Sequence, residues 1–293
     1  MTMNILFLAL YLLMAIVLQV FIGNFPSAFM AFPLNVLFMA LWGVVLLLLY
    51  QQEKHVGIIR HLLSPTATFY SLSLTFLGCL IIGIYPQKAL IDIASENNLA
   101  ATLGFYHFHT SWIFVAILLY IQSVLFLVTI RGWRNQQGIR WRFLLCHIGL
   151  WLIISSIFWG AADKKTLRVI AYKNHPTKEA IQENGHITHL PYEVCLQAFH
   201  VDYFPNGTPS HFEANVLLGS DSARLAINHP HSYSLTTDVY LTDYDTTLGS
   251  KSNYCILQIV YEPWKWFTAC GIWILLIGAI LLFIQGPTKK HEQ

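Results

Sequence analysis

Histidine is the residue type in this sequence that offers the most chemistry, because neutral imidazole binds transition metals and haem iron. The chain has 13 histidines among its 293 residues. Cysteine offers less: none of the five cysteines forms a Cys-x-x-Cys pair, which argues against a thioredoxin-like redox site and a structural zinc site. The apolar part of the sequence contains no nucleophilic triad, phosphate loop or pair of catalytic carboxylates. The histidines are therefore the first candidates for binding a cofactor.

His147 stands out because it lies inside the apolar segment RFLLCHIGLWLIISSIFWG, about one helical turn after Arg142. A polar side chain roughly 5–8 Å inside an apolar layer is costly and normally has a partner. Leu150, Trp151 and Ile154 share its helix face, and flat apolar walls suit a porphyrin or a neighbouring helix equally well. Two interpretations follow. His147 is an axial ligand of haem iron, with Trp151 packing against haem or a partner, or it is hydrogen-bonded to another span.

His107 and His109 form a second candidate, at the start of another apolar segment. With Tyr106 and Trp112 they fit an interfacial belt, in which amphipathic rings settle at headgroup level. The alternative interpretation is an axial ligand for an outward-facing haem.

His229 and His231 are a third candidate, for a metal ion. Residues at i and i+2 of a strand share a face. However, the intervening Pro230 indicates a loop, and the sequence suggests no third ligand.

Membrane-spanning helices are the elements expected to position these residues. The mean hydropathy is +0.52 and charged residues make up 11% of the chain, whereas a soluble domain carries about twice that share. Apolar runs of about 17–25 residues cross a bilayer. Such runs occur at about 4–22, 31–50, 67–85, 108–130, 143–161 and 264–284. The first lacks a basic n-region and is long enough to span, so we expect an uncleaved anchor rather than a signal peptide.

Lysine and arginine in short loops predict the orientation. Eight of them fall in the loops after the second and fourth runs and in the C-terminal tail: Lys54, Arg60, Arg131, Arg134, Arg140, Arg142, Lys289 and Lys290. The opposite short loops carry only Lys88. Both termini are therefore expected in the cytoplasm. The chain has no basic stripe of the kind that binds nucleic acid.

Residues 163–262 are expected to form a β-rich domain on the outer side, because 11 of the 15 acidic residues lie there. Period-two patterns predict strands at 168–173, 187–204, 211–219, 223–228, 238–245 and 253–262. Turn residues separate them, including Glu183-Asn184-Gly185 and Asn206-Gly207. Cys195 and Cys255 lie in predicted strands and can pair if the domain is oxidised.

The expected fold class is thus a multi-pass α-helical membrane protein, with about six spans and one β-rich extracytoplasmic domain between spans five and six. Residues 1–65 would form a two-span hairpin and a cytoplasmic loop. Residues 66–162 would form a three-span membrane domain containing His147. The β-rich domain at 163–262 would follow, and residues 263–293 would form the last span and a cytoplasmic tail.

Four sequence landmarks after His147 occur in a specific order: Leu190-Pro191-Tyr192, Asn206-Gly207-Thr208-Pro209, Asn228-His229-Pro230 and a strand bearing Tyr240. They follow the span CHIGLWLIISSIFWG and precede CILQIVYEPWKWFTACGIWILLIGAILLF, a strand that runs into the last span. In these features the chain resembles the ResB family of cytochrome c biogenesis proteins, over roughly residues 66–285 and weakly before His147.

The resemblance implies a subunit of a system II complex in the bacterial cytoplasmic membrane. Such proteins work with a CcsA/ResC-like membrane protein, carry haem b across the membrane and present it to apocytochrome c. His147 matches the family's transmembrane histidine, which is thought to ligate haem opposite a histidine of the partner. The chain departs from the family in its compact outer domain and its two additional N-terminal spans. It also lacks the partner's Trp-rich haem-handling motif, so it is not expected to be a catalyst on its own.

Two other functions are compatible with parts of the sequence. One is a structural or docking subunit of the same complex that holds no haem itself. The other is a cytochrome b-like electron-transfer subunit, which needs pairs of histidines on facing spans, whereas only His147 is expected within the membrane. A second axial ligand would have to come from His61 in the basic cytoplasmic loop, from an outer histidine or from another chain.

Overall fold

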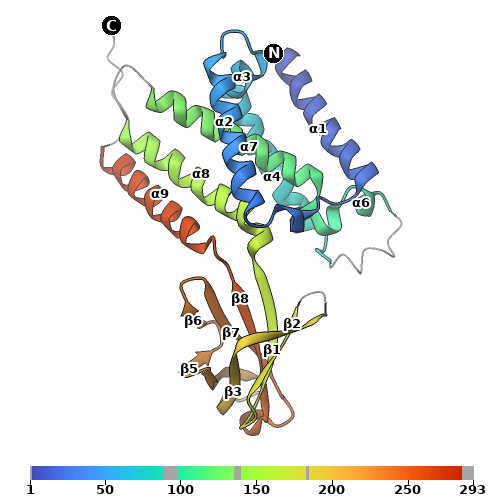
Figure 1. The fold of residues 1–293 in the computed structure, drawn as a ribbon, viewed down its shortest axis with the longest axis vertical. Coiled ribbons are helices and arrows are strands. Elements are labelled where there is room, and N and C mark those ends of the chain that lie inside the picture. Colours follow the sequence, from blue (N-terminus) through green and yellow to red (C-terminus); the bar gives the residue numbers. More distant parts are fainter. Residues whose placement is uncertain (1, 89–97, 135–139, 183–184, 286–293) are drawn as a thin grey trace. The chain divides into compact units, whose positions relative to one another are not determined.

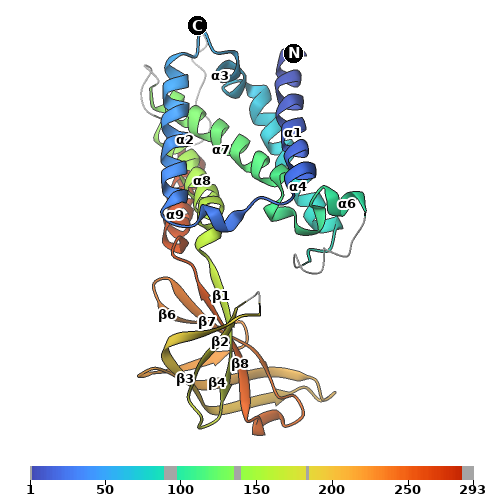
Figure 2. The same ribbon diagram turned by 45° about the vertical axis from the view of Figure 1, so that its right-hand side comes forward.

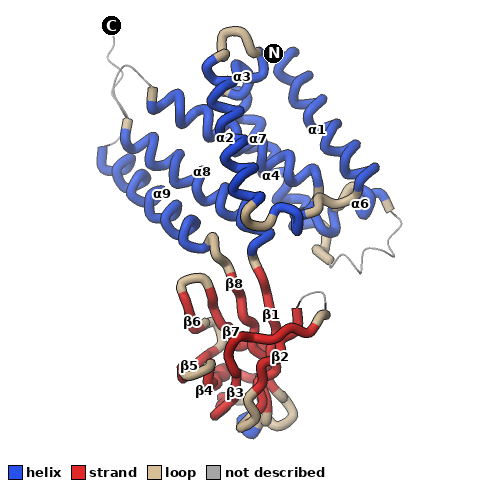
Figure 3. The backbone as a smooth tube through the Cα atoms, in the orientation of Figure 1, coloured by secondary structure: helices blue, strands red, loops and turns tan. Residues whose placement is uncertain are grey.

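The computed structural model describes residues 2–88, 98–134, 140–182 and 185–285. The chain divides into two compact units, one made of Met1–Ala162 with Phe267–Gln293 and one made of Asp163–Trp266. The described part of the first unit is helical, and the strands lie in the second, as the colouring in Figure 3 makes plain. We call them the helical unit and the sheet unit.

Six helices of the described residues are long and apolar enough to cross a membrane. They are α1 (Thr2–Ile22), α2 (Leu34–Gln51), α4 (Pro65–Ile84), α7 (Trp112–Trp133), α8 (Trp141–Gly160) and α9 (Lys265–Gln285) (Figure 1). Shorter helices lie in the connections: η1 (Ser27–Met30), α3 (Gly57–Leu62), α6 (Leu99–Thr102) and η2 (Phe105–Thr110). The predicted combination of six apolar helices and a separate β-rich domain is confirmed.

Local capping residues set the starts of two spans. The Ser64 side chain accepts a hydrogen bond from the Ala67 N–H, and Pro65 occupies the first position of α4, where its missing N–H costs nothing. The Ser111 side chain accepts from the Phe114 N–H, so α7 starts four residues later than the predicted span at 108. A serine cap satisfies an N–H that has no partner within the helix.

Helix α7 is the centre of the helical unit, because α1, α2, α4 and α8 all contact it (Figure 2). Polar links hold the bundle together. The Tyr11 hydroxyl of α1 donates to the Ala116 carbonyl of α7 at 2.7 Å. The Asn35 amide of α2 donates to the Trp159 carbonyl of α8, and the Trp159 indole donates to the Gln122 amide oxygen of α7. Each link satisfies polar atoms that would be costly to bury alone.

Helices α8 and α9 run side by side (Figure 1) and approach each other closely at glycines. A Cβ added to Gly149 of α8 would lie 2.6 Å from the Leu275 nitrogen and 2.7 Å from the Gly271 oxygen. A Cβ on Gly278 would lie 2.7 Å from the Cys146 nitrogen. Small residues let helix backbones come together in this way in membrane proteins.

The sheet unit contains one antiparallel sheet with the strand order β5-β4-β3-β2-β1-β8-β7-β6. Its eight described strands are β1 (Lys165–Tyr172), β2 (Thr177–Gln182), β3 (Ile187–Tyr203), β4 (Pro209–Leu218), β5 (Asp221–Ala226), β6 (His231–Ser234), β7 (Thr237–Tyr244) and β8 (Tyr254–Tyr261). The sheet curls, since the edge strand β5 also contacts β6 and β7 from the other edge (Figure 1). The curl encloses a core of inward-facing side chains that runs from Val169 to Ile259.

The six predicted strands are confirmed, and two further strands were missed. In β2 only Ala180 is buried, so the segment lacks an apolar alternation. Strand β6 has four residues and begins at His231, directly after the Pro230 that suggested a loop. The predicted turn at Asn206-Gly207 is present, with Gly207 at a φ of +82° that glycine adopts readily. Of the other predicted turn, Glu183 and Asn184 lie outside the described residues.

The cysteines of the sheet unit are separate thiols, so the disulfide that the sequence allowed is absent from the structure. Cys195 and Cys255 are both buried. Burial raises the pKa of the Cys255 thiol to about 12, which keeps it protonated and unreactive at neutral pH.

Candidate functional site

His147 lies in the first half of α8, one helical turn after Phe143. Its Nδ1 is 2.8 Å from the Phe143 carbonyl oxygen. The two aromatic rings also pack on each other, with centroids 3.9 Å apart and planes inclined by 31°. The imidazole is thus held by both a hydrogen bond and a ring contact, and it is only half-buried.

The hydrogen bond defines which nitrogen of His147 carries the proton. A carbonyl oxygen only accepts, so Nδ1 must be the donor, and in the neutral ring Nε2 then carries the lone pair. Among the described residues no group forms a hydrogen bond with Nε2. Metal-ligating histidines typically donate their other ring N–H to a backbone carbonyl or a carboxylate, which fixes the ring and its tautomer. His147 has this arrangement, and its donor set therefore fits a haem iron.

The side of α8 that carries His147 differs from the side that packs on α9. Gly149 faces α9, and at 3.6 residues per turn His147 points about 160° away from it. Trp151 lies one turn after His147, and its ring packs against Phe126 of α7 at 5.9 Å. Leu150, on the same side of α8, is 37% exposed. The histidine therefore borders a surface that α9 leaves uncovered.

His107 and His109 lie in η2, before α7 begins, and their ring centroids are 4.0 Å apart. The His107 Nδ1 is 2.9 Å from the Lys88 carbonyl oxygen. Gln87 fixes the same segment, because it accepts from the Phe108 N–H and donates to the Phe105 carbonyl. The segment is thus well ordered by its neighbours, and His107, like His147, has its Nδ1 held by a carbonyl.

His61 lies in the predicted connection between the second and third spans, but its side chain is buried there. It lies in α3, is 3% exposed and packs among Phe7, Tyr70 and Tyr120. Its Nε2 is 2.9 Å from the Tyr120 hydroxyl, whereas its Nδ1 has no hydrogen-bond partner among the described residues. Burial lowers the pKa of the His61 imidazole, which keeps it neutral. The Nε2 atom of His61 is therefore engaged by Tyr120 inside the bundle.

The sequence gives no clear signal for this burial. Along GIIRHL, Ile59, His61 and Leu62 are buried. Ile59 and His61 are two residues apart and lie on different sides of the helix, so no amphipathic stripe marks His61 as a buried residue.

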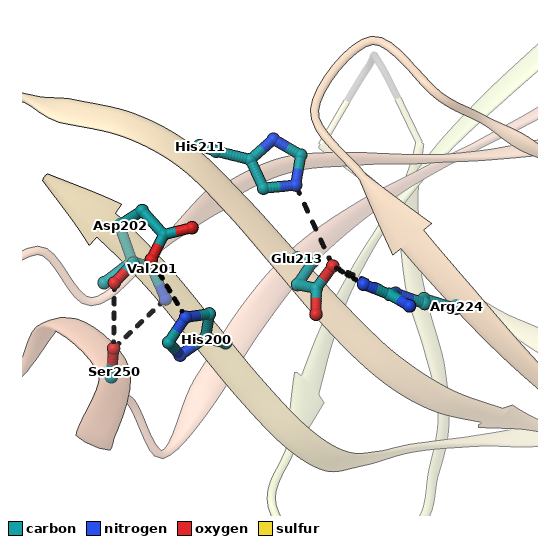
Figure 4. Close-up of polar contacts among 7 residues, drawn as sticks. All are labelled: His200, Val201, Asp202, His211, Glu213, Arg224 and Ser250. Atoms are coloured by element: carbon teal, nitrogen blue, oxygen red, sulfur yellow. Dashed lines mark hydrogen bonds and ion pairs between the residues drawn. The ribbon is translucent and has the colours of Figure 1, made fainter.

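Two histidines of the sheet unit, His200 of β3 and His211 of β4, lie on neighbouring strands at the surface (Figure 4). His200 pairs with Asp202 at 3.1 Å, and His211 lies 3.8 Å from Glu213, which also binds Arg224. Within the described residues no three histidine, cysteine or acidic side chains come together as a metal site. This includes His229 and His231, so the geometry there gives a metal ion no set of ligands.

Residues 137–253 match the family described as ResB-like. The match contains His147, α8 and strands β1 to β7, and it confirms the resemblance on the segment where the landmarks occur. It points to a role in cytochrome c biogenesis.

Comparison with solved structures gives an alignment with a chain entitled cytochrome c heme lyase CcmF. The alignment covers 73% of this chain, with 14% sequence identity and a TM-score of 0.36. This chain spans about a third of that protein's length, at 34%. A TM-score of this size does not establish a common fold. No curated protein matches the chain.

Proposed function

We propose that the chain is the ResB-like subunit of a system II cytochrome c maturation complex, and that it binds haem b in the membrane at His147. Haem is the cargo in this proposal, and His147 holds it for delivery to apocytochrome c. The observation that carries the proposal is the His147 imidazole, whose Nδ1 is held by the Phe143 carbonyl while Nε2 has no partner among the described residues.

Leaving Nε2 of His147 without a partner inside a membrane costs free energy. The window of α8 that contains His147 has a mean hydropathy of 1.9, typical of a spanning helix. An imidazole nitrogen without a partner is unfavourable in hydrocarbon. A ligand or a partner chain that supplies an acceptor of its lone pair removes this cost. Such a group can approach the side of α8 away from α9, where Leu150 is exposed.

A second protein is needed to complete the site. His147 is the only histidine within the six candidate spans of the described residues, and haem iron can take two axial side chains, as it does in cytochromes c. For the haem held at His147 we therefore propose a CcsA/ResC-like membrane protein as the partner, supplying the opposite ligand and the groups that attach haem to apocytochrome c.

The same proposal assigns sides to the membrane. The basic loops and both termini would face the cytoplasm of a bacterium, with α3 and the start of α8 on that side. The sheet unit would lie on the outer or periplasmic side, where apocytochrome c receives haem.

Trp151 has a subordinate role in this proposal. Its ring lies one turn from His147 on the same side of α8 and is braced by Phe126, so it would pack against the porphyrin or the partner. His107 and His109 are alternative ligands, for haem that has reached the opposite end of the helical unit.

The test is to purify the chain together with its CcsA-like partner and to compare the haem Soret absorbance of the wild type with that of His147→Ala. Cys146→Ala is the matched control, because it changes the neighbouring residue, which faces α9 rather than the side of α8 that carries His147. We expect His147→Ala to lose most of the haem, Cys146→Ala to retain it, and added imidazole to restore part of the absorbance to His147→Ala.

Equal haem content in wild type and His147→Ala would refute ligation by His147. Loss of haem in His107→Ala or His109→Ala, but not in His147→Ala, would move the site to η2. If none of the purified complexes contains haem, the chain acts as a docking subunit.

A further inference from the structure

The turn between strands β6 and β7 is bonded to the first turn of α9. The Trp266 indole donates to the Leu235 carbonyl oxygen at 2.6 Å. The Glu262 N–H donates to the Thr236 carbonyl oxygen at 2.7 Å. The turn thus has two hydrogen bonds to the segment that leads into α9, all within the sheet unit.

A partly buried ion pair strengthens this connection. Lys265, the first residue of α9, binds Asp238 of β7, and Ser232 of β6 donates to the same carboxylate at 2.7 Å. Burial alone would raise the pKa of Asp238, but the hydrogen bonds from Lys265 and Ser232 and the charge of Lys265 outweigh it, so the pKa is lowered. The carboxylate stays ionised at neutral pH, and the hairpin and the helix start are held as one body.

The turn exposes an apolar side chain at this point. Leu235 is 70% exposed and Trp266 is 48% exposed. Trp266 and Lys265 stand at the beginning of a 20-residue apolar segment with a mean hydropathy of 2.6. Tryptophan and lysine at the end of a spanning helix settle at headgroup level. Since the Leu235 carbonyl is bonded to Trp266, Leu235 is held at that level too.

We propose that the β6–β7 turn is a membrane-contact site, in which Leu235 enters the interfacial layer of the bilayer that α9 crosses. The occupant of this surface is lipid, because Leu235 is bonded through its carbonyl to Trp266, at the start of an apolar helix long enough to cross a membrane. The site adds a membrane contact to the sheet unit beside its chain connection into α9. The proposal requires that α9 spans the membrane and is independent of haem binding.

The chain offers a matched pair of positions for testing this. Leu235 precedes β7, and Leu248, which is 44% exposed, follows it. Strand β7 has eight residues, which at about 3.3 Å per residue separate its two ends by roughly 26 Å. A leucine at the turn and a leucine at the far end of the same strand can thus be compared within one folded unit.

The experiment uses the full chain, with its five cysteines replaced and Leu235→Cys or Leu248→Cys introduced. Each variant is labelled with an environment-sensitive fluorophore and reconstituted in phosphatidylcholine–phosphatidylglycerol vesicles. We expect blue-shifted emission and several-fold stronger quenching by headgroup-proximal spin-labelled lipid at position 235 than at 248. Equal quenching at both positions, or none at either, would overturn the proposal. A turn that binds a protein instead of lipid would give one of these two results.

A second measurement avoids replacing the native cysteines. A photo-crosslinking amino acid is placed at position 235 or 248 of the otherwise native chain in the same vesicles, and lipid adducts are detected by mass. Adducts concentrated at 235 would support the site, whereas equal yields at the two positions would contradict it.

Discussion

A backbone carbonyl one turn back along the helix decides what His147 can do. The Phe143 carbonyl accepts a hydrogen bond from the Nδ1–H, so Nε2 is the nitrogen with a lone pair for a metal. A histidine in the same helix with its Nε2 bonded to a neighbouring span would be structural. The distinction rests on the partner of a single nitrogen atom, which is why haem content in His147→Ala is a decisive measurement.

His61 gives a contrasting case and a prediction about pH. Burial lowers its pKa in the folded state, so the unfolded chain binds a proton more readily than the folded chain does. The resulting stability is present above the unfolded pKa of about 6.5 and is lost as the pH falls below it. We expect the unfolding temperature of the detergent-solubilised chain to drop between about pH 7.5 and about pH 5.

The variant His61→Gln separates this effect from general acid sensitivity. Glutamine does not titrate and can still pair with the Tyr120 hydroxyl, so the drop in unfolding temperature should be smaller than in the wild type. The same drop in both proteins would mean that His61 is not the group responsible.

At this scale the sequence predicted His147 as a candidate, because an isolated histidine in an apolar run is unusual. It did not predict the hydrogen bond from His147 to the Phe143 carbonyl. Every residue inside a helix has a carbonyl four positions before it, and the side-chain rotamer decides whether the two form a hydrogen bond. The burial of His61 was missed for a different reason: neighbouring charges such as Arg60 suggested a solvated loop, whereas Ile59, His61 and Leu62 of α3 are buried in the structure.

Among the elements, the contact of α8 with α9 is the one most sensitive to substitution. Gly149→Ala would place a methyl group 2.6–2.7 Å from backbone atoms of α9, which cannot move without separating the helices. Overpacking of this kind costs about 1–3 kcal/mol. We expect a lower unfolding temperature and more aggregation of the purified chain by size-exclusion chromatography.

Gly83→Ala in α4 is the control, because a Cβ there has nothing within 4 Å. Alanine is favoured over glycine in a helix by up to about 1 kcal/mol, so this variant should be as stable as the wild type or more so. If Gly149→Ala behaved like Gly83→Ala, the close approach of α8 and α9 would not contribute to stability.

The elements themselves were predictable where the pattern is strong. Long apolar runs gave six helices, and alternation gave six strands. The missed strands β2 and β6 lack this signal, because a strand such as β2 with a single buried residue is held by its neighbours in the sheet rather than by its own pattern.

At the scale of the whole molecule, the sheet unit has a core of its own. Its buried cluster runs from Val169 to Ile259 and includes no residue of the helical unit. We expect residues 163–263, expressed without the helices, to fold into a soluble β-rich domain with dispersed amide resonances in NMR spectra. An unfolded spectrum at neutral pH would mean that the sheet depends on the rest of the chain.

The first two helices are part of the bundle rather than an addition beside it. Tyr11 of α1 and Asn35 of α2 both form hydrogen bonds to the central helices. The sequence indicated these spans but not their partners, since uniformly apolar helices carry little information about which neighbour each one faces. Such contacts between distant segments were the part of the fold that sequence patterns left open.

The pairing of β1 with β8 has a consequence for how proteins of this kind can change in size. Lys165 at the start of the sheet lies opposite Tyr261 at its end, so the chain enters and leaves the domain through adjacent strands. The segment between β1 and β8 is therefore a single insertion, whose two ends are joined by the pairing of these strands. Strands can be gained or lost in the remote loops of such an insertion without altering where the chain rejoins the helices. Domains of very different lengths can therefore be inserted between the same pair of helices, α8 and α9, through an unchanged pair of strands.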